Sequence, residues 1–255
     1  GRDLKVRYKQ TAIGVAWVLL LPVLGAGILT FVFGVIGGVG EDAGVPAFAV
    51  AFCGMVGFQA AFGKTLNKAS ACLVQNTHLV QKIYFPRLAL PVSAALANVV
   101  DVAVAVAMLA VVMGATGAFA GWAVLLAPVF LALLLALGLG VGLALAALSV
   151  RFRDVQHITP VALQLLLFAS PVGYPLASVR EGLSGRLEPG AAAAVLGAYQ
   201  LNPVTPLLEG LRWSTLGTAA PEPAFLAWAA AASVGALAGG ALVFRRMERS
   251  FADVI

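Results

Sequence analysis

Residues 90 to 113 read LPVSAALANVVDVAVAVAMLAVVM, and Asp101 is the only charged residue among these 24. A helix of about 20 apolar residues is long enough to cross the roughly 30 Å hydrocarbon core of a lipid bilayer. The stretch therefore predicts a membrane-spanning helix. A carboxylate near the middle of a span is costly, so Asp101 is expected to face protein or water. It fits a hydrogen-bonded packing role and a place on a transport path equally well.

The composition of the whole chain also indicates an integral membrane protein. Of its 255 residues 61% are hydrophobic and 11% are charged, and the mean hydropathy is +0.98. So few polar side chains cannot cover the surface of a water-soluble globule. The lysines and arginines behind the net charge of +5 lie beside apolar stretches rather than on one basic face. This placement indicates that the basic residues set the orientation of the chain in the membrane. It predicts no nucleic-acid partner.

Five further apolar stretches extend the prediction to an all-α protein with six transmembrane helices. They cover residues 13–37, 45–63, 122–150, 158–174 and 223–244. The fifth span in chain order, 158–174, is short and contains Pro171, so by itself it also fits a re-entrant half-helix.

The distribution of lysine and arginine sets the orientation and the number of crossings. Only three of the 16 cations fall outside the N-terminus, the segment 64–89, the segment 151–157 and the C-terminus. Under the positive-inside rule these four regions are cytoplasmic. With both termini inside, the number of crossings is even, so 158–174 is predicted to cross and the total is six. Residues 1–12 are expected to form an interfacial helix along the inner leaflet.

The outer segment, residues 175–222, combines five prolines with apolar pieces that are too short to span. We expect these pieces to be short re-entrant helices, since irregular backbone at membrane depth is tolerated only where protein or a water-filled cavity covers it. The segment is therefore a candidate external gate, and a folded loop on the outer leaflet is the alternative. The candidate gate residues are Tyr174, Tyr199, Asn202 and Glu209.

Residues 76–87, NTHLVQKIYFPR, form a polar island in this apolar chain. At 100° per residue the polar side chains fall on one arc and the apolar ones on another, which predicts an amphipathic helix of about two turns. Asn76 is the expected N-cap, and Pro86 disfavours helix beyond Phe85. The polar arc consists of Gln75, His78, Gln81 and Lys82.

Signals for catalysis are weak in this sequence. The stretch FQAAFGKT, 58–65, has phenylalanine where a phosphate-binding loop requires its first glycine, and it ends an apolar helix. The stretch GLSG, 182–185, matches a short serine-protease motif, but a serine nucleophile needs a histidine base. His78 and His157 are both predicted on the opposite side of the membrane. No clustering of ligand residues suggests a metal, so we expect no catalytic residue, metal site or cofactor in this chain.

Paired glycines predict close helix contacts. Gly34 with Gly38, and Gly138 with Gly142, each give a small-xxx-small face on a membrane helix. Such a face serves either packing within the chain or a dimer seam.

Five stretches in the same order now carry a resemblance to a known family. They are VRYKQTAIGVAWVLLLPVL (6–24), LVQKIYFPRLALPVSAALANVVD (79–101), LSVRFRDVQHITPVALQLLLFASPVGYP (148–175), LNPVTPLLEGLRW (201–213) and FRRMERSFADVI (244–255). Together they resemble the membrane subunits of ATP-binding-cassette exporters that move polysaccharides, the group of O-antigen, capsule and teichoic acid permeases. The likeness covers essentially the whole chain.

The resemblance implies a homodimer around a central pathway, with two separate subunits that bind ATP and Mg and hydrolyse the ATP. It implies a lipid-linked polysaccharide as substrate, moved from the cytoplasm to the outer face of a bacterial plasma membrane. The chain would be multi-pass, surrounded by membrane lipids, with both termini cytoplasmic.

The resemblance also implies roles for particular residues. The island helix looks like the coupling helix that contacts the ATP-hydrolysing partner through Gln75, His78, Gln81 and Lys82. A second, smaller contact is expected from Arg151, Arg153 and Asp154. Aromatic side chains could line a path for sugar rings or could equally face lipid; with Asp101, these pathway candidates are Trp17, Phe31, Phe33, Phe48, Phe52 and Phe58.

Three rival functions remain open at this point. The nearest is the permease of a drug or lipid exporter of the same superfamily, although segments 6–24 and 79–87 favour the polysaccharide group. An intramembrane enzyme would depend on Ser184, and a channel would act without ATP.

Overall fold

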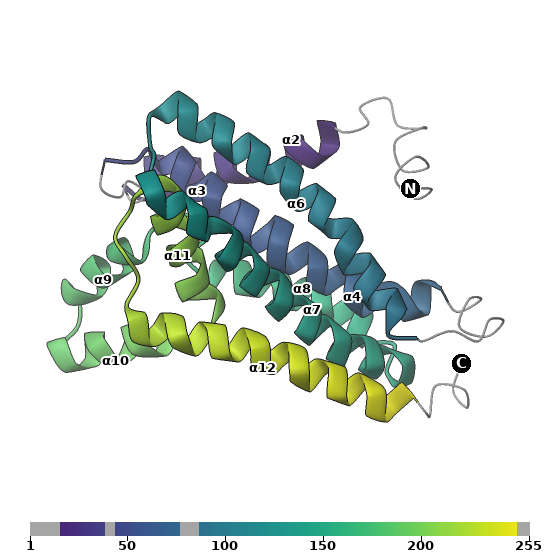
Figure 1. Cartoon of the computed structure of the whole chain (residues 1–255). Helices are drawn as coiled ribbons and strands as arrows, with labels where there is room; N and C mark the ends of the chain where they lie inside the picture. Colours follow the sequence, from purple (N-terminus) through teal and green to yellow (C-terminus); the bar gives the residue numbers. More distant parts are fainter. Residues whose placement is uncertain (1–15, 39–43, 77–86, 249–255) are drawn as a thin grey trace.

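The computed structural model of the chain describes residues 16–38, 44–76 and 87–248. These residues fold into helices with no strand among them, so the all-helical prediction is confirmed for the described part. The elements are α2 (Ala16–Leu29), η1 (Thr30–Ile36), α3 (Ala47–Met55), η2 (Val56–Gly63), α4 (Lys64–Gln75), α6 (Ala89–Thr116), η3 (Gly121–Leu126), α7 (Ala127–Arg151), α8 (Val155–Phe168), α9 (Leu176–Ser184), α10 (Pro189–Gln200), α11 (Val204–Leu216) and α12 (Pro223–Glu248). Figure 1 shows the long helices as a bundle.

Four helices in the described residues are long and apolar enough to cross a membrane: Ala47–Gln75, Ala89–Thr116, Gly121–Arg151 and Pro223–Glu248. Two shorter apolar helices, Leu20–Ile36 and Val155–Phe168, accompany them. The 14 residues of α8 extend only about 21 Å at 1.5 Å per residue, less than the hydrocarbon core. The helix predicted over 158–174 therefore ends at Phe168, before Pro171. Because a helix of this length does not reach across the hydrocarbon core, the count of six crossings stays a prediction.

The long helix Ala47–Gln75 corrects a predicted boundary. The span expected to end at residue 63 continues without a break through η2 and α4 to Gln75, so 64–75 is helix and not the start of a loop. Val56 and Lys64, where the elements meet, both have right-handed helical dihedrals. The reason is that Leu66, Leu73 and other apolar side chains of α4 are buried against α6 and α7, which extends the helix beyond its charged residues.

Helix α7 lies at the centre of the packing, between α4 and α12. A Cβ atom at Gly138 would lie 2.6 Å from the Phe62 carbonyl oxygen, and one at Gly142 would lie 2.7 Å from the Ala69 Cβ. The predicted small face of these two glycines therefore packs within the chain, against η2 and α4. It does not form a seam between two copies.

Helices α7 and α12 run side by side (Figure 1), and Gly140 of α7 lies directly against Gly240 of α12. A Cβ atom on Gly240 would overlap the backbone of Gly140, whereas one on the adjacent Gly239 would meet nothing within 4 Å. The crossing thus has no room for any side chain at residue 240.

The bundle has two distinct ends (Figure 1). At one end, here called the Gln75 end, lie the last residues of α4, α7 and α12 and the first residues of α6. There the Arg87 Nη1 donates to the Glu248 carbonyl oxygen at 2.7 Å, which joins α6 to α12. Helices α9 and α10 lie at the opposite end, here called the α9–α10 end.

Candidate functional site

A buried arginine organises the α9–α10 end of the molecule. Helix α11 is buried along almost its whole length, and the side chain of Arg212 is fully shielded from solvent. Its Nη1 donates to the Glu209 Oε1 at 2.6 Å, one turn earlier on the same helix. Its Nε donates to the Val50 carbonyl oxygen at 3.3 Å. The charge is therefore paired and hydrogen-bonded, as a buried guanidinium requires.

The remaining bonds of Arg212 hold the turn that follows α8. Its Nη2 donates to the carbonyl oxygen of Val172 at 2.8 Å and to that of Pro171. A Cβ atom on Gly54 of α3 would overlap the Val172 carbonyl oxygen and lie 2.7 Å from the Arg212 Nη2. Only a glycine at residue 54 lets this turn lie directly against α3. We call residues 169–175, fixed in this way, the clamped turn.

All four predicted gate residues contact the clamped turn or its flanks. The hydroxyl groups of Tyr174 and Tyr199 lie 2.9 Å apart. The Asn202 Nδ2 donates to the Ser170 Oγ at 2.9 Å, and the Glu209 Oε1 accepts from the backbone N–H of Leu176 at 3.3 Å. Burial, reinforced by the hydrogen bond with Tyr174, raises the pKa of Tyr199 far above its ordinary value. Its hydroxyl group thus stays neutral and remains available for this bond.

Arg212 itself was not among the predicted site residues. By sequence it is only one of three cations on the predicted outer side, together with Arg180 and Arg186. A signal was nevertheless present, since Glu209 and Arg212 are three residues apart in the apolar piece PLLEGLRW, a spacing that places them on one helix face.

A second buried ion pair involves Asp101. Its Oδ2 accepts from the Lys68 Nζ at 2.9 Å, and the same Nζ donates to the Asn98 Oδ1 at 2.8 Å. The Asn98 Nδ2 in turn donates to the Ala60 carbonyl oxygen at 2.8 Å and to the Thr65 Oγ1 at 3.0 Å. Of the two roles open to Asp101, the geometry supports hydrogen-bonded packing, which ties α6 to η2 and α4.

Replacing Asp101 by leucine is expected to destabilise the chain, whereas asparagine should be tolerated. Removing one partner of a buried ion pair costs about 3–5 kcal/mol, and the 24% exposure of the Lys68 side chain places the loss at the lower end. Asparagine retains an acceptor for the Lys68 ammonium group. Thermal unfolding of the purified chain in detergent measures both variants, and a leucine variant as stable as wild type would contradict the packing role.

The predicted pathway aromatics do not share one surface. Phe52 and Phe58 are fully buried in the hydrophobic core, so the prediction that they line a path is wrong for them in this chain. Phe31 is exposed, and the half-buried ring of Phe33 lies 4.9 Å from that of Tyr174. Partly buried Phe48 stacks on the ring of Phe52. Trp17 belongs to α2, but its side chain lies outside the described residues.

At the Gln75 end, the structure describes part of the predicted partner contact. Gln75 is the last residue of α4 and is exposed. The Asn76 Nδ2 donates to the Cys72 carbonyl oxygen at 2.8 Å, so Asn76 closes α4. The helix for which Asn76 is the predicted N-cap lies outside the described residues, so that role stays a prediction. His78, Gln81 and Lys82 lie outside the described residues. Arg151, the last residue of α7, is exposed, and so are Arg153 and Asp154 before α8.

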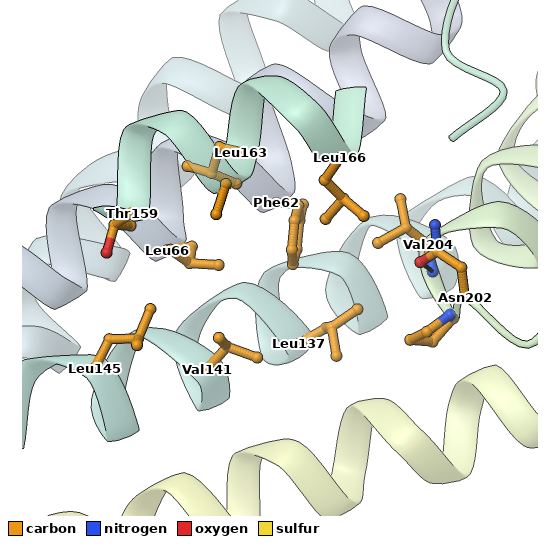
Figure 2. Close-up of a pocket in the computed structure, with 12 residues that line it drawn as sticks. Phe62, Leu66, Leu137, Val141, Leu145, Thr159, Leu163, Leu166, Asn202 and Val204 are labelled. Carbon is orange, nitrogen blue, oxygen red and sulfur yellow. Dashed lines mark hydrogen bonds between the residues drawn. The ribbon is translucent and has the colours of Figure 1, made fainter. Parts of the chain in front are cut away.

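An apolar cavity of about 290 Å³ runs along α8 (Figure 2). Thr159, Leu163 and Leu166 of α8 face Phe62 and Leu66 across it, and α7 forms its floor. Its far end reaches Asn202, the predicted gate residue bonded to the clamped turn. The cavity thus extends along α8 to the α9–α10 end.

Among the described residues, Ser184 and His157 of the enzymatic alternative lie near opposite ends of the molecule. The Ser184 Oγ donates to the Glu181 carbonyl oxygen at 2.9 Å, at the exposed end of α9. His157 belongs to the first turn of α8, near the Gln75 end. Within residues 16–38, 44–76 and 87–248 no group of three His, Cys, Asp or Glu side chains could hold a metal ion.

Comparisons with known proteins agree with this architecture. Residues 1–216 match a family model described as ABC-2 type transporter. The chain is also 28% identical over 255 residues to the O-antigen export system permease protein RfbA of Myxococcus xanthus. That similarity covers 100% of this chain and 92% of the relative.

Proposed function

The chain belongs to the ABC-2 type transporter family, and from this premise we propose that it is the membrane subunit of an ATP-driven polysaccharide exporter. The observation that carries the proposal is the similarity to an O-antigen export permease over the whole chain. The substrate is a lipid-linked polysaccharide, which moves from the cytoplasm to the outer face of a bacterial inner membrane. The four long apolar helices agree with a multi-pass membrane subunit.

The energy for transport comes from a separate subunit. An ABC-2 membrane subunit works with an ATP-binding partner, and two such partners would serve a homodimer of this chain. They bind the ATP and Mg. In this chain residues 58–65, the near match to a phosphate-binding loop, are helical and mostly buried. Their backbone N–H groups are therefore used within the helix and cannot cradle a phosphate.

The partner docks at the Gln75 end, which is cytoplasmic together with both termini. Support comes from the bias of lysine and arginine toward this side and from the exposure of Gln75 and residues 151–154 at this end. The coupling contact consists of Gln75, His78, Gln81 and Lys82, with Arg151, Arg153 and Asp154 beside them.

The external gate is formed by α9, α10 and the clamped turn. Support comes from the polar side chains that meet there, Tyr174 with Tyr199 and Asn202 with Ser170. Helix α11 anchors them through Glu209 and Arg212.

A complementation experiment tests this function. Depleting the chain is expected to remove a polysaccharide from the cell surface and to leave the polymer inside the cell, and wild-type protein should restore export. A variant with alanine at Gln75, His78, Gln81 and Lys82 should insert normally, because it keeps every apolar residue of the long helices. It should lose the co-purifying ATPase and fail to export, because two helical turns gain order only between a membrane base and a protein groove.

The matched control is Ser184→Ala, which alters an exposed polar residue at the other end and should export normally. Loss of export by Ser184→Ala with intact assembly would favour an enzyme instead. Normal surface polysaccharide after depletion, with a changed resistance to drugs, would contradict the proposed substrate. Normal export by the fourfold variant would move the coupling contact to Arg151–Asp154.

A further inference from the structure

A polar groove of about 380 Å³ lies between η2–α4 and α8, on the side of α8 next to the apolar cavity. Its polar lining consists of Gln59, Lys64, Asn67 and Gln164. The groove thus offers one cationic group and three amides.

The groove lies at membrane depth. Ala47–Gln75 is one helix of 29 residues, with residue 61 at its middle. At 1.5 Å per residue, Gln59, Lys64 and Asn67 lie within about 9 Å of that middle along the axis. Amide and ammonium groups at this depth are costly against lipid and are expected to face protein or water. This face of the helix therefore borders a polar space and not the hydrocarbon.

The π-helix η2 aligns these polar groups. The Lys64 backbone N–H donates to the Gln59 carbonyl oxygen, the i to i+5 bond of a π-turn. Residues five apart thus lie on one face of the helix. In an α-helix the same two residues would point away from each other. Between Ala49 and Leu66, Gln59 is the only exposed residue. The irregular turn therefore places Gln59 and Lys64 together on the open side of an otherwise buried segment.

Helix α8 separates two spaces of opposite character. Gln164 lines the polar groove, Thr159 and Leu166 line the apolar cavity, and Leu163 borders both. Residues one position apart on a helix point about 100° away from each other. A molecule with a polar head and a hydrocarbon chain could therefore occupy both sides of Leu163 at once. Within α8 only Thr159 is buried, so this helix leaves room for such an occupant.

We propose that the polar groove binds the phosphate-linked sugar of the lipid carrier and that the apolar cavity takes its hydrocarbon chain. This rests on the proposed function. The Lys64 ammonium group contacts the phosphate, because a charge-assisted N–H···O bond is stronger than a neutral one. Gln59, Asn67 and Gln164 each donate and accept hydrogen bonds, which matches the hydroxyl groups of a sugar.

Binding of a defined lipid to the full chain tests the site. The chain is reconstituted in nanodiscs of phosphatidylcholine and titrated with fluorescent polyprenyl-phosphate-linked glucose. Lys64→Gln should weaken binding about tenfold or more, the loss of one charge-assisted bond, whereas Lys64→Arg should stay near wild type. Arg186→Gln, which removes an exposed cation at the α9–α10 end, is the matched control and should change nothing. Uncharged polyprenol should bind weakly and equally to wild type and Lys64→Gln.

Three results would overturn the site. They are equal binding of the probe by wild type and Lys64→Gln, equal affinity for polyprenol and the phosphate-linked sugar, or displacement of the probe by phosphatidylglycerol as efficient as by the unlabelled phosphate-linked sugar. The binding assay does not depend on export. If depletion leaves surface polysaccharide unchanged while binding still requires Lys64, the proposed function fails and the site stands. If depletion blocks export but Lys64→Gln binds and exports normally, the function stands and the site fails.

Discussion

Replacing Arg212 by methionine should largely abolish stable folding of the chain. The substitution removes the donor to Glu209 and to the carbonyl oxygens of Val50, Pro171 and Val172. Breaking a buried ion pair costs about 3–5 kcal/mol, and each buried acceptor left unsatisfied adds about 1–3 kcal/mol. Native proteins have only about 5–15 kcal/mol of stability in total. The level of protein in the membrane and its thermal unfolding in detergent should both fall sharply.

The exposed pair between Arg180 and Glu222 supplies the control. Its Nη2 to Oε1 distance is 3.1 Å, and the two side chains are 58% and 53% exposed. Exposed pairs contribute about 0–1 kcal/mol, so Arg180→Met should unfold close to wild type. A double variant, Glu209→Leu with Arg212→Met, should recover part of the loss because it leaves no buried carboxylate without its cation. An Arg212→Met protein as stable as wild type would show that the clamped turn is held by other contacts.

Adding one methyl group to Gly240 should separate α7 from α12. A Cβ there would overlap the backbone of Gly140, and backbone atoms cannot turn away as the end of a flexible side chain can. Overpacking a core costs about 1–3 kcal/mol and occasionally more, and a backbone overlap belongs to the upper part of that range. We expect Gly240→Ala to lower the thermal unfolding midpoint and to increase degradation in the membrane.

Gly239→Ala is the matched control for this crossing. The two positions are adjacent on α12, and the added methyl group at residue 239 would meet nothing within 4 Å. Alanine also favours a helix over glycine by about 1 kcal/mol. Gly239→Ala should therefore be as stable as wild type or slightly more stable. Equal effects of the two substitutions would mean that close approach at Gly140 is not what limits residue 240.

The long helices could be predicted from the sequence because a long apolar run avoids water, whether it packs against protein or faces lipid. The stretch 90–113 and helix α6 agree within a few residues, and so do 223–244 and α12 except at the last turn. The ends of helices that carry charged residues were harder to predict. Lys68 looks like a residue of the membrane surface until Asp101, 33 residues away in sequence, is found beside it. The hydropathy of a sequence window includes the charged residue but not the partner that neutralises it from elsewhere in the chain.

The candidate site was predictable only in part, for a similar reason. Tyr174, Tyr199, Asn202 and Glu209 stood out as polar residues in an outer, proline-rich segment, and the structure brings them together. Arg212 resembled an ordinary exterior cation, although its environment is made by carbonyl oxygens of α3 and the clamped turn. Backbone acceptors leave no trace in a sequence. The aromatic residues show the converse: periodicity gives Phe52 and Phe31 equal standing, yet one is core and the other exposed.

The unbroken helix from Ala47 to Gln75 acts mechanically as a strut. Its last residue is exposed at the end where we place the ATPase, and Val50 and Gly54 near its start touch Arg212 and the clamped turn. About 32 Å of rigid helix separates Gly54 from Gln75, with no loop between them to absorb movement. A tilt of this helix at Gln75 must therefore displace, at the same time, the backbone that contacts the clamped turn. The movements at the two ends of the protein are then coupled by the rigid helix alone and require no series of side-chain rearrangements between them.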